Sequence, residues 1–128
     1  MIQARNIDCA TSFTSLTGET SASASFVDMS GTYTIPKDGL YFIGSSLTSR
    51  SAGSTKFINT TRAYCGTELI IPEVQFVSTQ NYASNNSIRG FISSVFYGRA
   101  GDIVKLQTKN ANITNHGIIH NSLIKKIV

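Results

Sequence analysis

Several residue types that would point to a particular class of protein are scarce in this chain. It has no tryptophan, two cysteines and two prolines, and only 14% of its residues are charged. No apolar run approaches the roughly 18 residues that cross a membrane, so we expect no membrane insertion. The N-terminal stretch MIQARNIDCA lacks the apolar core of a secretory signal peptide.

The two cysteines form no recognisable motif. The spacing of Cys9 and Cys65 matches neither a zinc knuckle nor a redox pair. Cys9 alternates with Ile7 and Phe13, which predicts a small buried apolar side chain. A Cys9–Cys65 disulfide is the alternative, because pairing depends on a separation in space that the sequence does not supply.

Positive charge is in slight excess and is dispersed. The formal net charge is +4, yet only Lys125 and Lys126 are adjacent basic residues. Nucleic-acid-binding proteins usually gather Lys and Arg on one face or in one run, so we expect no nucleic-acid partner. Attraction to an anionic surface such as a cell-wall polymer is a second interpretation.

No group of residues indicates an enzyme or a metal centre. On one strand, His116 and His120 would stand about 13 Å apart, too far to share an ion within one chain. We expect loop or surface histidines, or else one histidine from each of three copies around an ion. No G-x-S-x-G elbow, calcium loop or phosphate-binding glycine loop occurs. We therefore predict no catalytic residue, no metal and no cofactor.

Small polar residues and period-two alternation are what the chain has in abundance. Ser, Thr and Asn make up 40 of its 128 residues, which indicates a neutral polar surface. No window shows a helical stripe, and turn signals separate about eight to ten short strands. This pattern predicts an all-β, antiparallel sandwich, jelly roll or barrel that occupies residues 1–128 as a single domain.

Particular segments carry their own predictions. Residues 1–13 and 26–35 read as strands, and residues 14–25 as a polar loop. Residues 40–49 are apolar on both faces, which favours a central strand buried on both sides. Pro72 is restricted to a sheet edge or a break in a strand.

Three motifs carry a resemblance to a known family. They are SGTYTIPKDGLYFI at 30–43, VFYGRAGDIVKL at 95–106 and NSLIKKIV at 121–128. In order and spacing they resemble the complement one-q and tumour-necrosis-factor-like jelly-roll domains over residues 26–128. No collagen-like repeat precedes them, and the Ser, Thr and Asn content is more similar to jelly rolls of bacteriophage fibres, tail tips and capsid decorations.

The motif residues have physical roles in such a fold. Gly31 and Gly39 would bracket a tight β corner, with Asp38-Gly39 tolerating positive φ. Asp102 would cap the backbone amides of its own turn after Gly101. The full set of expected corner and core residues is Gly31, Tyr33, Pro36, Gly39, Tyr41, Phe42, Gly101 and Asp102.

The resemblance also implies a homotrimer, because members of this family pack three copies around an axis. The residues that we expect at the interface are Tyr41, Ile43, Phe91, Val95 and Tyr97. A ligand would be expected in the polar loop at 79–89, where a tyrosine stands among amides, as suits a saccharide. The candidates are Asn81, Tyr82, Asn85 and Arg89, and an ordinary long loop is the alternative.

Two classes of function follow. The first is a non-enzymatic trimeric structural and adhesion module on the surface of a virus particle: a phage head fibre, a capsid decoration or a tail-fibre tip. Its partners would be other virion proteins and a host cell-surface glycan. The second is an extracellular, complement one-q-like soluble recognition protein that binds proteins or glycans.

Overall fold

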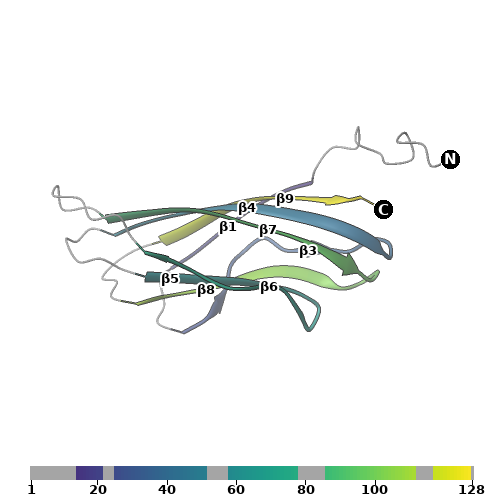
Figure 1. The fold of residues 1–128 in the computed structure, drawn as a ribbon, viewed down its shortest axis with the longest axis horizontal. Helices are drawn as coiled ribbons and strands as arrows, with labels where there is room; N and C mark the ends of the chain where they lie inside the picture. Colours follow the sequence, from purple (N-terminus) through teal and green to yellow (C-terminus); the bar gives the residue numbers. More distant parts are fainter. Residues whose placement is uncertain (1–13, 22–24, 52–57, 78–85, 112–116, 128) are drawn as a thin grey trace.

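Two antiparallel β-sheets packed face to face form the molecule (Figure 1). The computed structural model describes residues 14–21, 25–51, 58–77, 86–111 and 117–127. Within them lie nine strands and no helix. The strands are β1 (Thr14–Ser21), β2 (Val27–Asp28), β3 (Tyr33–Thr34), β4 (Gly39–Ser51), β5 (Ile58–Cys65), β6 (Glu68–Val77), β7 (Asn86–Gly98), β8 (Ile103–Ala111) and β9 (Gly117–Lys126).

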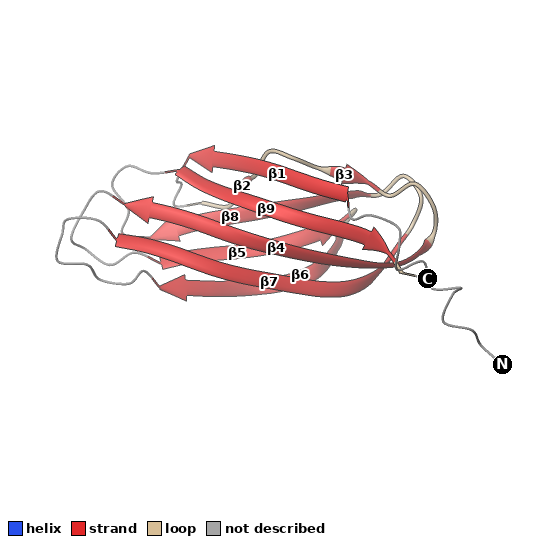
Figure 2. Ribbon diagram, turned by 90° about the horizontal axis from the view of Figure 1, so that it is seen from above, coloured by secondary structure: helices blue, strands red, loops and turns tan. Residues whose placement is uncertain are grey.

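The strand order defines a jelly roll. Sheet A has the order β1-β9-β4-β7, and sheet B has the order β2-β8-β5-β6, with β3 also paired to β8. From β3 onward the chain changes sheet at every connection except the β5–β6 hairpin. The strands of both sheets follow the long axis of the molecule (Figure 2), as in an aligned sandwich. The predicted all-β antiparallel jelly roll is confirmed.

The core lies between the inner faces of the two sheets, and the period-two alternation places residues in it. On β8, Val104 and Leu106 are fully buried, whereas Ile103 is 47% exposed. From sheet A the ring of Tyr41 is fully buried and stacks on that of Phe96, with ring centroids 5.9 Å apart. Such rings contribute large apolar areas to a thin sandwich core.

Strand β4 lies between β9 and β7 in sheet A, so its predicted central position is confirmed. The prediction that it is buried on both sides is wrong for the single chain. Tyr41 and Ile43 point inward and are fully buried, but Leu40 and Phe42 on the other face are only partly buried. The reason is that no described segment lies over the outer face of sheet A (Figure 1).

Residues 14–21 form edge strand β1 where the sequence predicts a polar loop. Strand β1 pairs with β9 along its whole length. Gly18 makes this possible, because a β-carbon there would collide with the backbone carbonyl of Ser30 and with the ring of His120. A strand of small polar residues lacks the apolar alternation that reveals the other strands. The strand predicted at 1–13, Cys9 included, lies outside the described residues.

The segment 26–35 is two short strands instead of one. Both β2 and β3 pair with β8, and the chain leaves the sheet between them. Gly31 lies in that break with a φ of 84°, and a β-carbon there would stand 2.5 Å from the carbonyl oxygen of Thr17. The backbone conformation and the close approach both require glycine.

The turn between β7 and β8 is formed as expected, but its cap comes from another segment. The amide of Asp102 donates to the carbonyl of Arg99 at 3.0 Å, and Gly101 takes a φ of 93°, as the third position of a type II turn requires. The carboxylate that accepts from the amide of Ala100, at 2.8 Å, belongs to Asp38. The prediction that Asp102 caps this turn is therefore wrong.

The turn at 36–39 also differs from its prediction. Gly39 begins β4 opposite Gly98, is buried, and is not among the glycines with positive φ. Pro36 stands between β3 and β4, as the motif requires. Pro72 lies on edge strand β6, within the register shift between the pairs Thr61–Val74 and Ala63–Ile71, so its predicted placement is confirmed.

Candidate functional site

The outer face of sheet A carries most of the exposed apolar surface. Among the described residues, eight large apolar side chains are exposed, and five of them stand on this face. We call these five the apolar face: Phe91, Val95 and Tyr97 on β7, and Ile119 and Leu123 on β9. Patches of this kind mark interaction sites in soluble proteins.

Strand β4 lies between β7 and β9, the two strands that carry the apolar face. Its Phe42 pairs with Val95, and its Gly44 pairs with Leu123. At Gly44 a β-carbon would stand 3.1 Å from the rings of both Phe42 and Phe91, so these rings lean over the glycine. Beside them lies a hollow of about 300 Å³, lined among others by Gly44, Phe91 and Leu123. The face therefore combines apolar projections with a depression.

The five residues expected at a trimer interface fall into two groups. Phe91, Val95 and Tyr97 are 65%, 56% and 55% exposed and belong to the apolar face. Tyr41 and Ile43 are fully buried between the sheets, so assigning them to an interface is wrong. Successive side chains of a strand point to opposite faces. Tyr41 and Ile43 therefore point into the sandwich, and Phe42 between them points outward.

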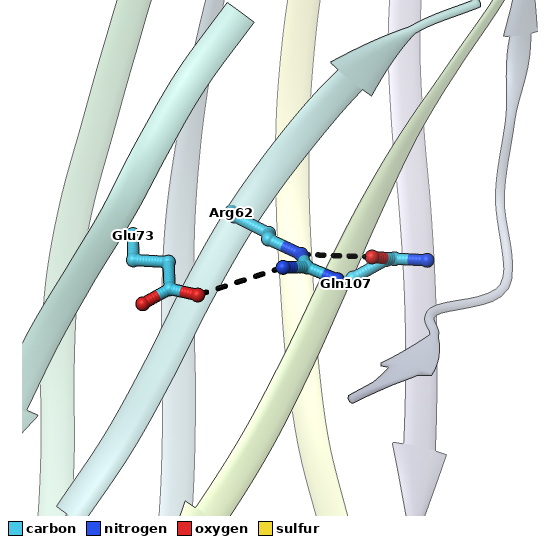
Figure 3. Close-up of polar contacts among 3 residues, drawn as sticks. All are labelled: Arg62, Glu73 and Gln107. Atoms are coloured by element: carbon cyan, nitrogen blue, oxygen red, sulfur yellow. Dashed lines mark hydrogen bonds and ion pairs between the residues drawn. The ribbon is translucent and has the colours of Figure 1, made fainter. Parts of the chain in front are cut away.

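The outer face of sheet B is crossed by a row of polar side chains in contact with one another, one from each of four of its five strands. Gln107 on β8 donates to Asp28 on β2 at 2.7 Å and accepts from Nε of Arg62 on β5 at 2.9 Å. Nη1 of Arg62 lies 3.5 Å from Oε1 of Glu73 on β6. Figure 3 shows Arg62 reaching Gln107 on one side and Glu73 on the other. We call these four residues the cross-sheet row.

Aromatic rings flank the guanidinium of the cross-sheet row. The Cζ of Arg62 lies 3.7 Å from the ring centroid of Phe26 and 5.2 Å from that of Tyr64. The Nζ of Lys109 lies 4.7 Å from the Phe26 centroid. This group of residues was not predicted from the sequence. The one sequence feature that points to it is the alternation, along β5 and β8, of buried residues with charged or amide residues.

The only described histidine lies inside the sandwich. His120 is fully buried, with Nδ1 2.8 Å from Oγ of Ser122 and Nε2 3.0 Å from the carbonyl oxygen of Ser30. A carbonyl only accepts, so Nε2 carries the proton in the neutral ring. Burial lowers the pKa of His120, which favours that neutral form. The prediction of a surface histidine is wrong for His120, and His116 lies outside the described residues.

His120 and Ser122 are the residue types of a catalytic base and its nucleophile, but both are buried and inaccessible to a substrate. Ser122 is 1% exposed and its Oγ lies 2.7 Å from that of Ser45, which is also buried. A nucleophile must reach a substrate carbonyl or phosphorus, and these hydroxyls face the core. The group links β9 to β4 and is structural.

A second polar group occupies the inner face of sheet B. Nδ2 of Asn59 donates to Oγ1 of Thr108 at 2.6 Å and to Oδ1 of Asn110 at 3.0 Å, and Thr61 donates to Oδ1 of Asn59 at 2.7 Å. All four residues are buried, and Nδ2 of Asn110 has no hydrogen-bond partner among the described residues. Such a network fixes the pairing of β5 with β8, because a shifted register would leave buried amides unpaired.

Cys65 is a buried thiol at the end of β5. It is 3% exposed and free, and burial followed by the nearby Asp102 and Glu68 carboxylates raises its pKa to about 11. A thiol with this pKa is not a ready nucleophile at neutral pH. Because Cys65 is free, the alternative of a Cys9–Cys65 disulfide is not borne out, and Cys9 itself lies outside the described residues.

The candidate ligand loop is largely beyond the described residues. Asn81, Tyr82 and Asn85 lie in the stretch 78–85, of which the structure describes nothing. Arg89 belongs to strand β7 and is exposed on the outer face of sheet A, where it pairs with Thr48. In the described ranges no three His, Cys, Asp or Glu residues gather as metal ligands. These ranges also contain no helix long and apolar enough to span a membrane.

Comparison with known proteins agrees with the jelly-roll topology. No protein-family model matches the sequence, and no curated protein matches it. Among solved structures, the chain is similar to PRD1 vertex protein P5, with a TM-score of 0.52 and 14% identity over 89% of this chain and 96% of that one. The chain is thus a jelly-roll domain that shares the fold of this vertex protein.

Two further solved structures show weaker likenesses. One is the Eiger TNF of S. frugiperda, with a TM-score of 0.49 and 10% identity over 92% of this chain and 94% of that one. The other is the globular domain of the zebrafish complement 1qA protein, with a TM-score of 0.47 and 15% identity over 84% of this chain and 94% of that one.

Proposed function

We propose that this chain is a non-enzymatic, trimeric structural and adhesion module on the surface of a virus particle. The observation that carries the proposal is the apolar face, which stands on the outer face of sheet A with no described segment over it. A surface of this kind is stabilised when it is covered by another protein. A second copy of the same chain is the simplest cover.

The position of the apolar face favours a ring of copies. Three of its five residues lie on β7, which is an edge strand of sheet A. A neighbour that approaches this edge meets Phe91, Val95 and Tyr97 together. A head-to-tail contact of this kind closes into a cyclic oligomer when its rotation fits. The number three comes from the sequence resemblance to complement one-q and tumour-necrosis-factor-like domains.

The place on a virus particle rests on analogy of fold. The similar PRD1 protein is described as a vertex protein, and a shared fold raises the expectation of a related role without establishing it. A domain at such a position contacts other virion proteins on one side and the host surface on the other. Analysis of purified particles by protein mass spectrometry would test this location.

Assembly through the apolar face is tested by Val95→Glu. Val95 is 56% exposed, so a glutamate is tolerated in the single chain but would bury an unpaired charge in the assembly. We expect a mass near that of a single chain in sedimentation velocity. Ile103→Glu is the matched control, because Ile103 is 47% exposed on the outer face of sheet B. A trimer that survives Val95→Glu, or one that Ile103→Glu dissociates equally, would contradict the proposed interface.

A further inference from the structure

The outer face of sheet B carries a hollow whose lining differs from the rest of the surface. Its volume is about 330 Å³, and it is lined by Arg62, Tyr64, Gly66, Thr67, Lys105 and Gln107. A neighbouring hollow of about 480 Å³ shares Gly66 and Lys105 with it. The second hollow is also lined by Asp102 and Ile103, and together the two hollows form a depression along β5 and β8, on the opposite side of the molecule from the apolar face.

The strand register brings four of these side chains into a square. Arg62 pairs with Gln107, and Tyr64 pairs with Lys105, in the antiparallel ladder between β5 and β8. Residues two apart on a strand share one face. A guanidinium, a phenol ring, an ammonium and an amide therefore stand beside one another without any loop to position them.

The cross-sheet row orients the guanidinium before any ligand arrives. Nε of Arg62 is held by Gln107, which is itself held by Asp28, and the ring of Phe26 lies 3.7 Å from the guanidinium carbon. The Arg62 side chain is only 24% exposed, so it is partly withdrawn from solvent. No hydrogen bond within the described residues engages Nη2 of Arg62. A cation fixed in this way loses little freedom when it binds a carboxylate or phosphate.

Local charge favours an anion in the hollow that Arg62 lines. Among the described residues, its lining carries two cations, Arg62 and Lys105, and no carboxylate, whereas the carboxylate of Asp102 lines the neighbouring hollow. The two ion pairs of this face are long, at 3.5 Å for Arg62–Glu73 and 3.7 Å for Lys105–Asp28. The carboxylate of each pair is more than half exposed, at 52% for Glu73 and 56% for Asp28. Long pairs with a solvated partner contribute little, so a ligand anion could replace them at small cost.

We propose that this depression binds an anionic saccharide. The anion would be held between Arg62 and Lys105, an apolar sugar face would pack on Tyr64, and ring hydroxyls would bond to Gln107 and Thr67. Because the trimer proposed above would cover sheet A, sheet B would stay open to the host surface; the choice of a saccharide rests on that proposed function. The shared chemistry is a sugar polymer bearing a carboxylate or a phosphate.

The test is calorimetric titration of the full chain with three probes. They are a hyaluronan oligosaccharide, which carries carboxylates, a glycerol-phosphate oligomer, which carries phosphates, and a neutral N-acetylglucosamine oligomer of the same length. We expect binding of at least one anionic probe and none of the neutral one, and the preferred probe identifies the anion. Equal binding of the neutral probe, or no binding of either anion, would overturn the proposal.

Variants locate the site. Lys105→Gln and Arg62→Gln should each lower the affinity for the anionic probe about tenfold or more, because each removes a positive charge that contacts the anion. Lys109→Gln is the matched control: it removes the same charge from the same face, yet Lys109 does not line the depression. We expect it to change affinity by less than about twofold. An equal loss in Lys109→Gln would show diffuse attraction and overturn the site.

This experiment separates the two proposals. Within the described part of the chain, the one ion pair of Lys105 is its long contact with the exposed carboxylate of Asp28, so Lys105→Gln keeps the fold even where Arg62→Gln loosens it. A trimer that binds no probe contradicts the saccharide site alone. A monomer that binds an anionic probe at this site contradicts the proposed assembly alone.

Discussion

Both nitrogens of the buried His120 ring contact neutral oxygen atoms of described residues. Ser122 and the Ser30 carbonyl contact its two nitrogens, and Ser45 lies behind Ser122. None of these groups is charged, so a protonated ring would find no counter-ion there. A buried histidine of this kind acts on stability through its charge.

We predict that His120 makes the fold less stable in mild acid. Burial puts the pKa of His120 in the folded chain below the ordinary value of 6.5. Between these two pKa values the unfolded chain therefore binds more protons than the folded chain. The stabilising contribution is complete above pH 6.5 and is lost as the pH falls through the folded pKa. Thermal unfolding from about pH 7.5 to about pH 5 measures it.

The control for this prediction is His120→Gln. Glutamine retains an amide that can donate to Ser30 but does not titrate, and His116 is present in both proteins. We expect the variant to lose less melting temperature than the natural chain over the same pH interval. Parallel curves for the two proteins would contradict the role assigned to His120.

At the scale of elements, turns from distant parts of the chain support one another. Asp38, which precedes β4, accepts from the amide of Ala100 in the turn between β7 and β8. The amide of Ile35 donates to the carbonyl of Asp102 at 2.8 Å, and that of Gly101 donates to the carbonyl of Ile35 at 2.8 Å. The two most recognisable motifs of the sequence are therefore parts of one corner.

We predict that Asp38→Ala lowers the free energy of unfolding by about 1 kcal/mol, because the amide of Ala100 loses a charged acceptor. Asp102→Ala removes a carboxylate that makes no hydrogen bond within the described residues, so it should change the free energy of unfolding by less than about 0.5 kcal/mol. Urea unfolding of both variants measures the difference. A larger loss of unfolding free energy in Asp102→Ala than in Asp38→Ala would contradict this assignment and indicate that Asp102 caps the turn.

The sequence predicts elements whose residues alternate and misses those that depend on partners. Residues 40–49 predict strand β4, and the period-two alternation predicts that most of the remaining chain forms short strands. Strand β1 was missed because its stability comes from pairing with β9 and from the space left at Gly18. The break between β2 and β3 depends on the approach of Gly31 to Thr17, which no local pattern records.

The candidate sites also differ in how far the sequence predicts them, because alternation is visible in the sequence and contacts between distant strands are not. Alternation placed Phe91, Val95 and Tyr97 on one face of β7, but could not say which face of β4 turns inward, so Tyr41 and Ile43 were misassigned. The cross-sheet row joins four strands far apart in sequence. Its geometry follows from the register of sheet B, which is a property of the folded chain.

At the scale of the whole molecule, the two outer faces have opposite character. Sheet A presents the apolar face, and sheet B presents charged, amide and aromatic side chains around a polar depression. A single chain leaves the first face in water at a cost, whereas the second is well solvated. This asymmetry is what a protein needs when one side assembles and the other meets a ligand.

The most direct test is the absolute mass of the natural chain in solution, by light scattering on a size-exclusion column at successive dilutions. The single chain has a mass of 13.8 kDa. We predict a mass near three times this value that persists on dilution, because the apolar face is covered in the assembly. A mass of 13.8 kDa at every concentration would contradict the trimer and leave the apolar face without its proposed occupant.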